Sequence, residues 1–182
     1  MNWKNNPDSY GLIHIAMHWG MAMIIAVLLP LGLWMTGLDY YDPWYKKGPD
    51  LHRAVGVLLG LVLLARIAWR LCGPLPASLA RSRWEALAAH AAHLLLYLLP
   101  LLLIVTGYLI STADGRAVDV FGWFEVPATL QGIDGQEDIA GDVHFFLAMF
   151  LLVIIALHMG AALRHHFILK DDTLRRMCKS DK

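Results

Sequence analysis

The chain has 182 residues, of which 58% are hydrophobic and 16% are charged, whereas soluble domains carry about 25% charged residues. This composition argues against a water-soluble globular domain. Its 15 basic and 15 acidic residues cancel, so the chain lacks the basic excess with which proteins bind nucleic acid. The two cysteines, Cys72 and Cys178, are too far apart for a C-x-x-C motif, which argues against a disulfide scaffold, a thiolate metal cluster and covalently attached haem.

Four segments are apolar over the length of about 20 residues that a helix needs to cross a bilayer. Three of them include a long stretch without formal charge, and the second carries Arg66 and Arg70 near its end, from where long side chains can reach the interface. The expected spans are residues 10–37, 51–72, 85–112 and 142–168.

Each span is expected to be a helix, because backbone groups in lipid must form their hydrogen bonds within the segment and the alternation of a barrel strand is absent. The predicted fold is an all-α integral membrane protein, a four-transmembrane-helix bundle that forms one domain over residues 1–182. Pro30 and Pro100 are expected to kink or end a regular stretch of the first and third spans. The connection between the third and fourth spans, which contains Trp123, Phe124 and Pro127, is expected to lie along the membrane interface.

The distribution of Lys and Arg predicts a multi-pass membrane protein with both termini in the cytoplasm, because cytoplasmic loops carry an excess of these residues. In this orientation four basic residues lie outside: Lys46, Lys47, Arg53 and Arg116. Eleven lie inside: Lys4, Arg66, Arg70, Arg81, Arg83, Arg164, Lys170, Arg175, Arg176, Lys179 and Lys182.

Histidines within the spans each need a polar partner, because an imidazole loses its hydration in hydrocarbon. His52 and His144 both lie within a few residues of the outer boundary, and no other histidine does. His158 follows His144 by about four helical turns, so one helix presents two imidazoles on one face, about 21 Å apart along its axis.

The inner partner of His158 is ambiguous on spacing alone. His18 is favoured, because it lies about two turns into the first span, near the depth of His158. For His14, His90 and His93 we expect a supporting hydrogen bond, a contact with a haem propionate, or plain polar packing. His165 and His166 are expected to be interfacial residues that face water.

Two facing histidines at matched depth in an apolar bundle suit a low-spin haem iron, whereas zinc would need more ligands or bound water. Gly20, Gly56 and Gly60 either make room for the macrocycle or allow close helix packing. The candidate partners of the haem propionates are Arg53, Arg66 and Arg164. The alternative is that these long side chains only extend to the membrane interface.

Several segments that hold these histidines resemble the prokaryotic cytochrome b561 family. They are Ile15 to Trp19, Asp50 to Gly56, His90 to His93 with Tyr97, Pro100 and Gly107, Gly141 to His144, Leu157 to His158, and Arg164 to Phe167. The tail from Lys170 to Met177 resembles that of the bacterial superoxide oxidases in this family. The likeness covers nearly the whole chain, and the four histidines in order are its most specific feature.

The resemblance implies a dihaem b cytochrome in which His18 and His158 ligate the inner haem and His52 and His144 the outer haem. It further implies an enzyme that transfers electrons from superoxide at the periplasmic face to ubiquinone. A first alternative is an electron-relay subunit that links a partner dehydrogenase or hydrogenase to the quinone pool. A second is a haem-free membrane scaffold or metal transporter.

Superoxide is an anion, so its capture requires a positive patch at the outer face. That face is acidic as a whole, with ten Asp and Glu against four basic residues. Lys46, Lys47, Arg53 and Arg116 form a local cluster beside the outer haem, with loop solubility as the alternative. A quinone pocket near Trp123, Phe124 and Pro127 is one interpretation of that aromatic segment, and interfacial anchoring is the other.

Overall fold

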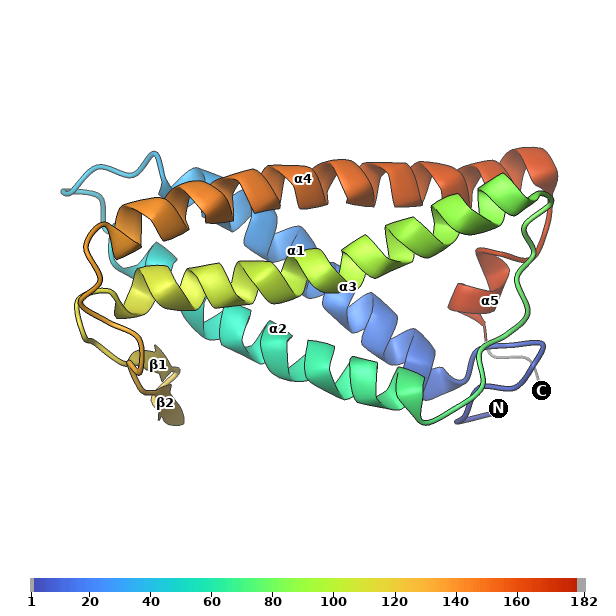
Figure 1. Cartoon of the computed structure of the whole chain (residues 1–182), viewed down its shortest axis with the longest axis horizontal. Helices are drawn as coiled ribbons and strands as arrows, with labels where there is room; N and C mark the ends of the chain where they lie inside the picture. The colour runs from blue at the N-terminus through green and yellow to red at the C-terminus, as the bar shows by residue number, and fades with distance from the viewer. Residues whose placement is uncertain (1, 180–182) are drawn as a thin grey trace.

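The computed structural model describes residues 2–179 and consists mainly of long helices (Figure 1). These are α1 (Leu12–Met35), α2 (Lys47–Leu71), α3 (Arg83–Thr112) and α4 (Gln136–Arg164). A π-helical turn, η1 (His165–Leu169), continues α4, and a short helix, α5 (Arg175–Cys178), follows it. Four helices of the described chain are long and apolar enough to cross a membrane, with η1 extending the last of them to Leu169. The predicted four-helix membrane architecture is confirmed.

The first residues of two spans differ from the sequence prediction. Helix α2 begins at Lys47 and α4 at Gln136, several residues earlier than expected. The first turn of α4 contains Glu137 and Asp138, and acidic residues there stabilise the positive end of the helix dipole. The predicted starts at residues 51 and 142 therefore mark where the apolar segments begin, whereas the helices themselves begin earlier, among charged residues.

Both prolines lie inside helices that continue past them, so neither ends a span. Pro30 is in α1, and Pro100 is a fully buried residue of α3. Serine at the start of α3 caps the helix, since the Ser82 hydroxyl accepts a hydrogen bond from the backbone N–H of Glu85 at 3.2 Å.

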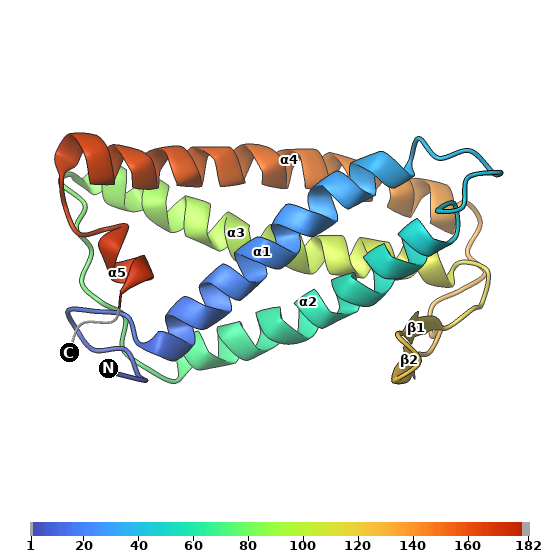
Figure 2. The ribbon, with the colours of Figure 1, turned by 180° about the vertical axis from the view of Figure 1, so that it is seen from behind.

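The four long helices run along one axis, with both chain termini and α5 at one end and two short strands at the other (Figures 1 and 2). We call these the terminal end and the hairpin end. Helix α1 packs against α2, and α3 packs against both α2 and α4. The views from both sides show α1 crossing the bundle obliquely, so that it passes from α2 at the terminal end toward α4 at the hairpin end.

The strands β1 (Val118–Val120) and β2 (Phe124–Val126) form an antiparallel hairpin in the connection expected to lie along the interface. Its register places Val118 opposite Val126, Asp119 opposite Glu125 and Val120 opposite Phe124. Phe121 and Gly122 both have positive φ, as a tight hairpin turn requires. Val118 and Val120 are buried, and β1 packs against α2. The hairpin therefore covers the start of the helix that carries His52.

Two apolar clusters fill the middle of the bundle. The first joins α1 and α2 through Met21, Leu28, Leu59 and Leu63. The second joins α3 and α4 and includes Leu151, which lies midway along the chain between His144 and His158. A packed apolar layer thus separates the two levels of histidines.

Candidate functional site

One pair of histidines meets near the hairpin end. His52 of α2 and His144 of α4 have ring centroids 6.2 Å apart, with their planes inclined at 69°. Both side chains are partly buried, and the Nδ1 atom of His52 is buried with no hydrogen-bond partner within the described chain. Two helices that are not consecutive in the chain thus bring together the pair that depth alone predicted.

A second group of histidines meets toward the terminal end. His18 of α1 and His158 of α4 have centroids 6.2 Å apart and planes at 65°. His93 of α3 is also close to His158, at 5.5 Å. The structure therefore brings together His18 and His158, and it adds His93, one of the histidines that spacing left open as a partner of His158.

The separation within each pair suits one metal ion between two imidazoles. A nitrogen ligand lies about 2.0 Å from the metal and about 1.1 Å from the centre of its own ring, so opposed rings have centroids about 6 Å apart. Both pairs match this value at 6.2 Å. Within the described residues, no group of three or more His, Cys, Asp or Glu side chains is arranged to hold a metal ion. The donor set thus fits a macrocycle that supplies the remaining ligands itself.

Three glycines differ in what surrounds them. An added Cβ at Gly20 or Gly56 would meet no atom within 4 Å, whereas one at Gly60 would contact Ile104 at 3.5 Å. Gly20 and Gly56 therefore do not serve close packing within the described chain, and the open space next to them is compatible with a flat cofactor. Gly60 serves close packing of α2 on α3.

Glycines also lie directly beneath both imidazoles near the hairpin end. A Cβ at Gly32 would lie 3.1 Å from the Cε1 atom of His52, and one at Gly107 would lie 3.3 Å from the Cε1 atom of His144. Both distances are shorter than side chains normally tolerate. Each ring can therefore take its position only because the helix facing it, α1 or α3, has no side chain there.

The three arginines considered as propionate partners have different surroundings. Arg66 donates to the Tyr97 hydroxyl at 3.0 Å, and its Nη2 atom lies 3.1 Å from Nδ1 of His18. Arg53 forms an ion pair with Asp50 on its own helix, and Arg164 forms one with Glu85 of α3. Arg66 is thus the one of the three that reaches a histidine pair.

His14 is almost completely buried, at 3% exposure, and its ring stacks on Tyr10 with centroids 4.6 Å apart. Its Nδ1 atom has no hydrogen-bond partner within the described chain. Burial raises the pKa of Tyr10 against the opposing effect of nearby arginines, so the phenol stays neutral. His90 and His93 are both exposed on α3, and it is His93 whose ring lies close to that of His158.

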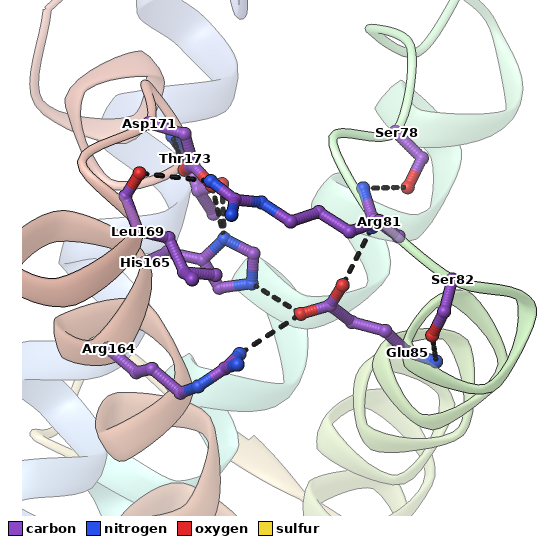
Figure 3. A network of polar contacts seen from close by, with 10 residues as sticks. Ser78, Arg81, Ser82, Glu85, Arg164, His165, Leu169, Asp171 and Thr173 are labelled. Carbon is purple, nitrogen blue, oxygen red and sulfur yellow. Dashed lines mark hydrogen bonds and ion pairs between the residues drawn. The ribbon is translucent and has the colours of Figure 1, made fainter.

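The expectation that His165 faces water is wrong. Its side chain is 12% exposed and lies between two carboxylates, with Nδ1 2.6 Å from Asp171 and Nε2 3.3 Å from Glu85 (Figure 3). Arg164 also reaches Glu85, and Arg81 donates to the carbonyl oxygen of Leu169. The π-helical turn after α4 and the left-handed residue that ends it fold the chain back so that these groups meet. His166, in contrast, is exposed as expected.

Asp171 anchors the segment that follows this turn. Burial acts to raise its pKa, but hydrogen bonds with Thr173 and His165 outweigh it and lower the pKa to about 2. We expect Asp171→Asn to loosen the tail, so that trypsin cleaves at Arg175 and Arg176 several times faster. Asp172→Asn is the matched control, because this neighbouring carboxylate is 64% exposed and contacts only Arg175 within the described chain. Equal cleavage rates in both variants would contradict the anchoring role.

A cleft of about 400 Å³ lies at the hairpin end, between the start of α2 and β1. Its walls include Leu51 and Arg53, the two neighbours of His52. The charged lining residues are Lys47, Arg53, Arg116, Asp50 and Asp119. The cluster predicted from the sequence included these three cations and Lys46, which lines a different hollow. The prediction missed Asp119 beside them, because only the packing of the hairpin on α2 brings it to this place.

Comparison with known proteins identifies a family and several relatives of this chain. Residues 9–180 match the model of the family described as prokaryotic cytochrome b561. The chain is similar to "Cytochrome b561 homolog 2" of Escherichia coli (strain K12), with 50% identity over 97% of this chain and 95% of the relative. It is also similar to "Probable superoxide oxidase CybB" of Yersinia pestis, with 29% identity over 92% and 94% of the two chains. "Cytochrome b561 homolog 1" of Escherichia coli (strain K12) is 25% identical over 93% and 97%. The chain belongs to the prokaryotic cytochrome b561 family.

Proposed function

We propose that this membrane cytochrome holds two haem b groups, one between His18 and His158 and one between His52 and His144, and transfers electrons from superoxide to ubiquinone. Family membership makes the chain a membrane haem b electron-transfer protein. Two haems are proposed because two histidine pairs, at two levels of one bundle, have the same distance of 6.2 Å between their ring centroids. The haem-free alternative loses its support, because proteins of this family bind haem b.

Haem b supplies one-electron chemistry when it is bound. The four imidazoles would hold the haems, and the chain contributes their orientation and an apolar layer around Leu151 between the two levels. In the proposed reaction two superoxide anions each lose one electron and become oxygen. One ubiquinone gains these two electrons and two protons and becomes ubiquinol.

The cleft beside His52 supports superoxide as the electron donor. Lys47, Arg53 and Arg116 outnumber the lining carboxylates Asp50 and Asp119 there by one charge. Arg53 pairs with Asp50 and Arg116 with Asp114, so Lys47 is the cation through which the cleft would attract an anion. A positive site with low-dielectric walls raises the encounter rate of a small anion by about tenfold or more. The resemblance to the Yersinia pestis protein, whose name is that of a probable superoxide oxidase, favours the same donor.

Stopped-flow absorbance tests this reaction. Oxidised, quinone-depleted protein is mixed with superoxide at low ionic strength, and we expect the spectrum of reduced haem b to develop. The double variant Lys47→Gln, Arg116→Gln should react several times more slowly and depend less on salt, because steering by charge is screened. Lys4→Gln, which changes an exposed lysine at the terminal end, is the matched control. Haems that stay oxidised in the wild-type protein would overturn the assignment of superoxide.

The acidic outer surface favours a second candidate, an electron-relay subunit that docks a redox protein. Ten acidic residues against four basic ones lie on the side expected to be outside, and they suit a partner with a basic surface. Co-purification of a stoichiometric redox protein that reduces the haems, combined with no response to superoxide, would support this candidate over the first.

We propose the bacterial inner membrane as the location, with the terminal end in the cytoplasm, because the predicted cytoplasmic side carries eleven of the fifteen basic residues. Cys72 and Cys178 are both free, exposed and at this end. A membrane-impermeant maleimide should therefore label inside-out vesicles and spare intact spheroplasts. A protein with both cysteines replaced by serine and carrying Asp134→Cys, an exposed site at the hairpin end, should show the reverse. Labelling of the native cysteines in spheroplasts would refute this orientation.

A further inference from the structure

The imidazole of His144 has a hydrogen-bond partner that its counterpart His52 lacks. The Oγ1 atom of Thr106, on α3, lies 3.0 Å from Nδ1 of His144, and the backbone carbonyl of Leu103 on the same helix is a further hydrogen-bond partner of this imidazole. Nδ1 of His52 is buried and has no partner within the described chain. The two ligands proposed for the same haem therefore differ in what holds them.

Donor counting decides the direction of this hydrogen bond. A threonine hydroxyl has one hydrogen to donate and two lone pairs to accept with. Oγ1 of Thr106 lies 2.9 Å from the carbonyl oxygen of Leu102 and 3.1 Å from that of Leu103. Carbonyl oxygens can only accept, so the hydroxyl hydrogen is directed to them, and the lone pairs of Oγ1 face His144.

The consequence is that Nδ1 of His144 carries the hydrogen and Nε2 carries the free lone pair. This is the tautomer that binds a metal through Nε2, and such partners of a metal-bound histidine fix the ring and make it a stronger electron donor. Gly107, the residue after Thr106, allows the ring to lie against α3. One turn of α3 thus supplies both the hydrogen-bond acceptor and the space.

We propose that Thr106 is a positioning residue that orients His144 and lowers the reduction potential of the haem near the hairpin end. This inference rests on the proposed haem ligands. A more electron-rich imidazole stabilises ferric over ferrous iron, so removal of the acceptor should raise the potential. The haem between His18 and His158 should not respond, because its ligand His18 faces the Arg66 guanidinium instead.

The test is a potentiometric titration of purified holoprotein carrying Thr106→Val, which keeps the side-chain shape and removes the hydroxyl, with Thr106→Ser as the matched control. In the valine variant we expect the ratio of reduced to oxidised haem at the hairpin end, at a fixed applied potential, to increase about tenfold. This corresponds to a rise of about 59 mV in the midpoint potential for one electron. The serine variant should match the wild type, and the other haem should not move in either protein. His52→Ala identifies which of the two titrating signals belongs to the hairpin end.

Loss of one haem in Thr106→Val with retention of both in Thr106→Ser also supports the proposal, because only the hydroxyl distinguishes these proteins. Unchanged potentials in the valine variant, or equal changes in both variants, would overturn it. A wild-type protein with fewer than two haems would instead refute the underlying haem assignment, which separates the two kinds of failure.

Discussion

Replacement of either histidine at the hairpin end, as His52→Ala or His144→Ala, should reduce the haem content of the purified protein from two to one per polypeptide. Each ring faces the other at 6.2 Å across the space proposed for iron, and no third histidine contacts this pair within the described chain. An iron left with one axial imidazole in an apolar pocket is expected to dissociate or to become high-spin. Pyridine haemochrome analysis with reduced-minus-oxidised spectra measures both outcomes. Retention of both low-spin signals would refute the ligand assignment.

At the other level, the same measurement distinguishes His18 from His93 as the partner of His158. We expect His18→Ala to remove one haem and His93→Ala to keep both, because His18 and His158 have the same separation as the hairpin-end pair whereas His93 lies closer, at 5.5 Å. Monodisperse elution in size-exclusion chromatography serves as the folding control. If His93→Ala loses the haem and His18→Ala retains it, the ligand assignment at this level is reversed.

The second large effect is expected from the glycines beneath the imidazoles. Gly32→Val should abolish binding of the haem near the hairpin end, because even a Cβ atom would lie 3.1 Å from the ring of His52 and a branched side chain adds two further carbons. Gly32→Ala should have a smaller effect in the same direction, and Gly107→Ala a smaller one still, since its Cβ would lie 3.3 Å from His144. Haem content and the spectrum of the remaining haem provide the measurement.

Gly160→Ala is the matched control for this series. It lies on α4, two residues after His158, and an added Cβ meets no atom within 4 Å. Alanine is favoured over glycine within a helix by about 1 kcal/mol, so this variant should bind both haems and be no less stable than the wild type. A loss of haem in Gly160→Ala equal to that in Gly32→Val would show that the effect does not arise from contact with the imidazole.

Much of the architecture was predictable because lipid imposes simple requirements on a chain. A span must be apolar over about 20 residues and must satisfy its own backbone, so the number of helices followed from the apolar segments. The levels of His52, His144 and His158 followed from the constant rise of a helix. The resemblance to the cytochrome b561 family, carried by motifs around the histidines, was confirmed by the family match over residues 9–180.

Other features depend on contacts between helices and could not be read from spacing along one helix. His93 meets His158 because α3 packs on α4, and Thr106 reaches His144 across the same contact. His165 looked like an interfacial residue because it follows Arg164, but the π-helical turn directs it between Glu85 and Asp171. Spacing along the chain determines depth in the membrane, whereas the rotation and crossing of the helices determine which side chains of equal depth touch. The sequence alone therefore established the membrane bundle and its histidine levels, and the tertiary structure decided which groups support and position each imidazole.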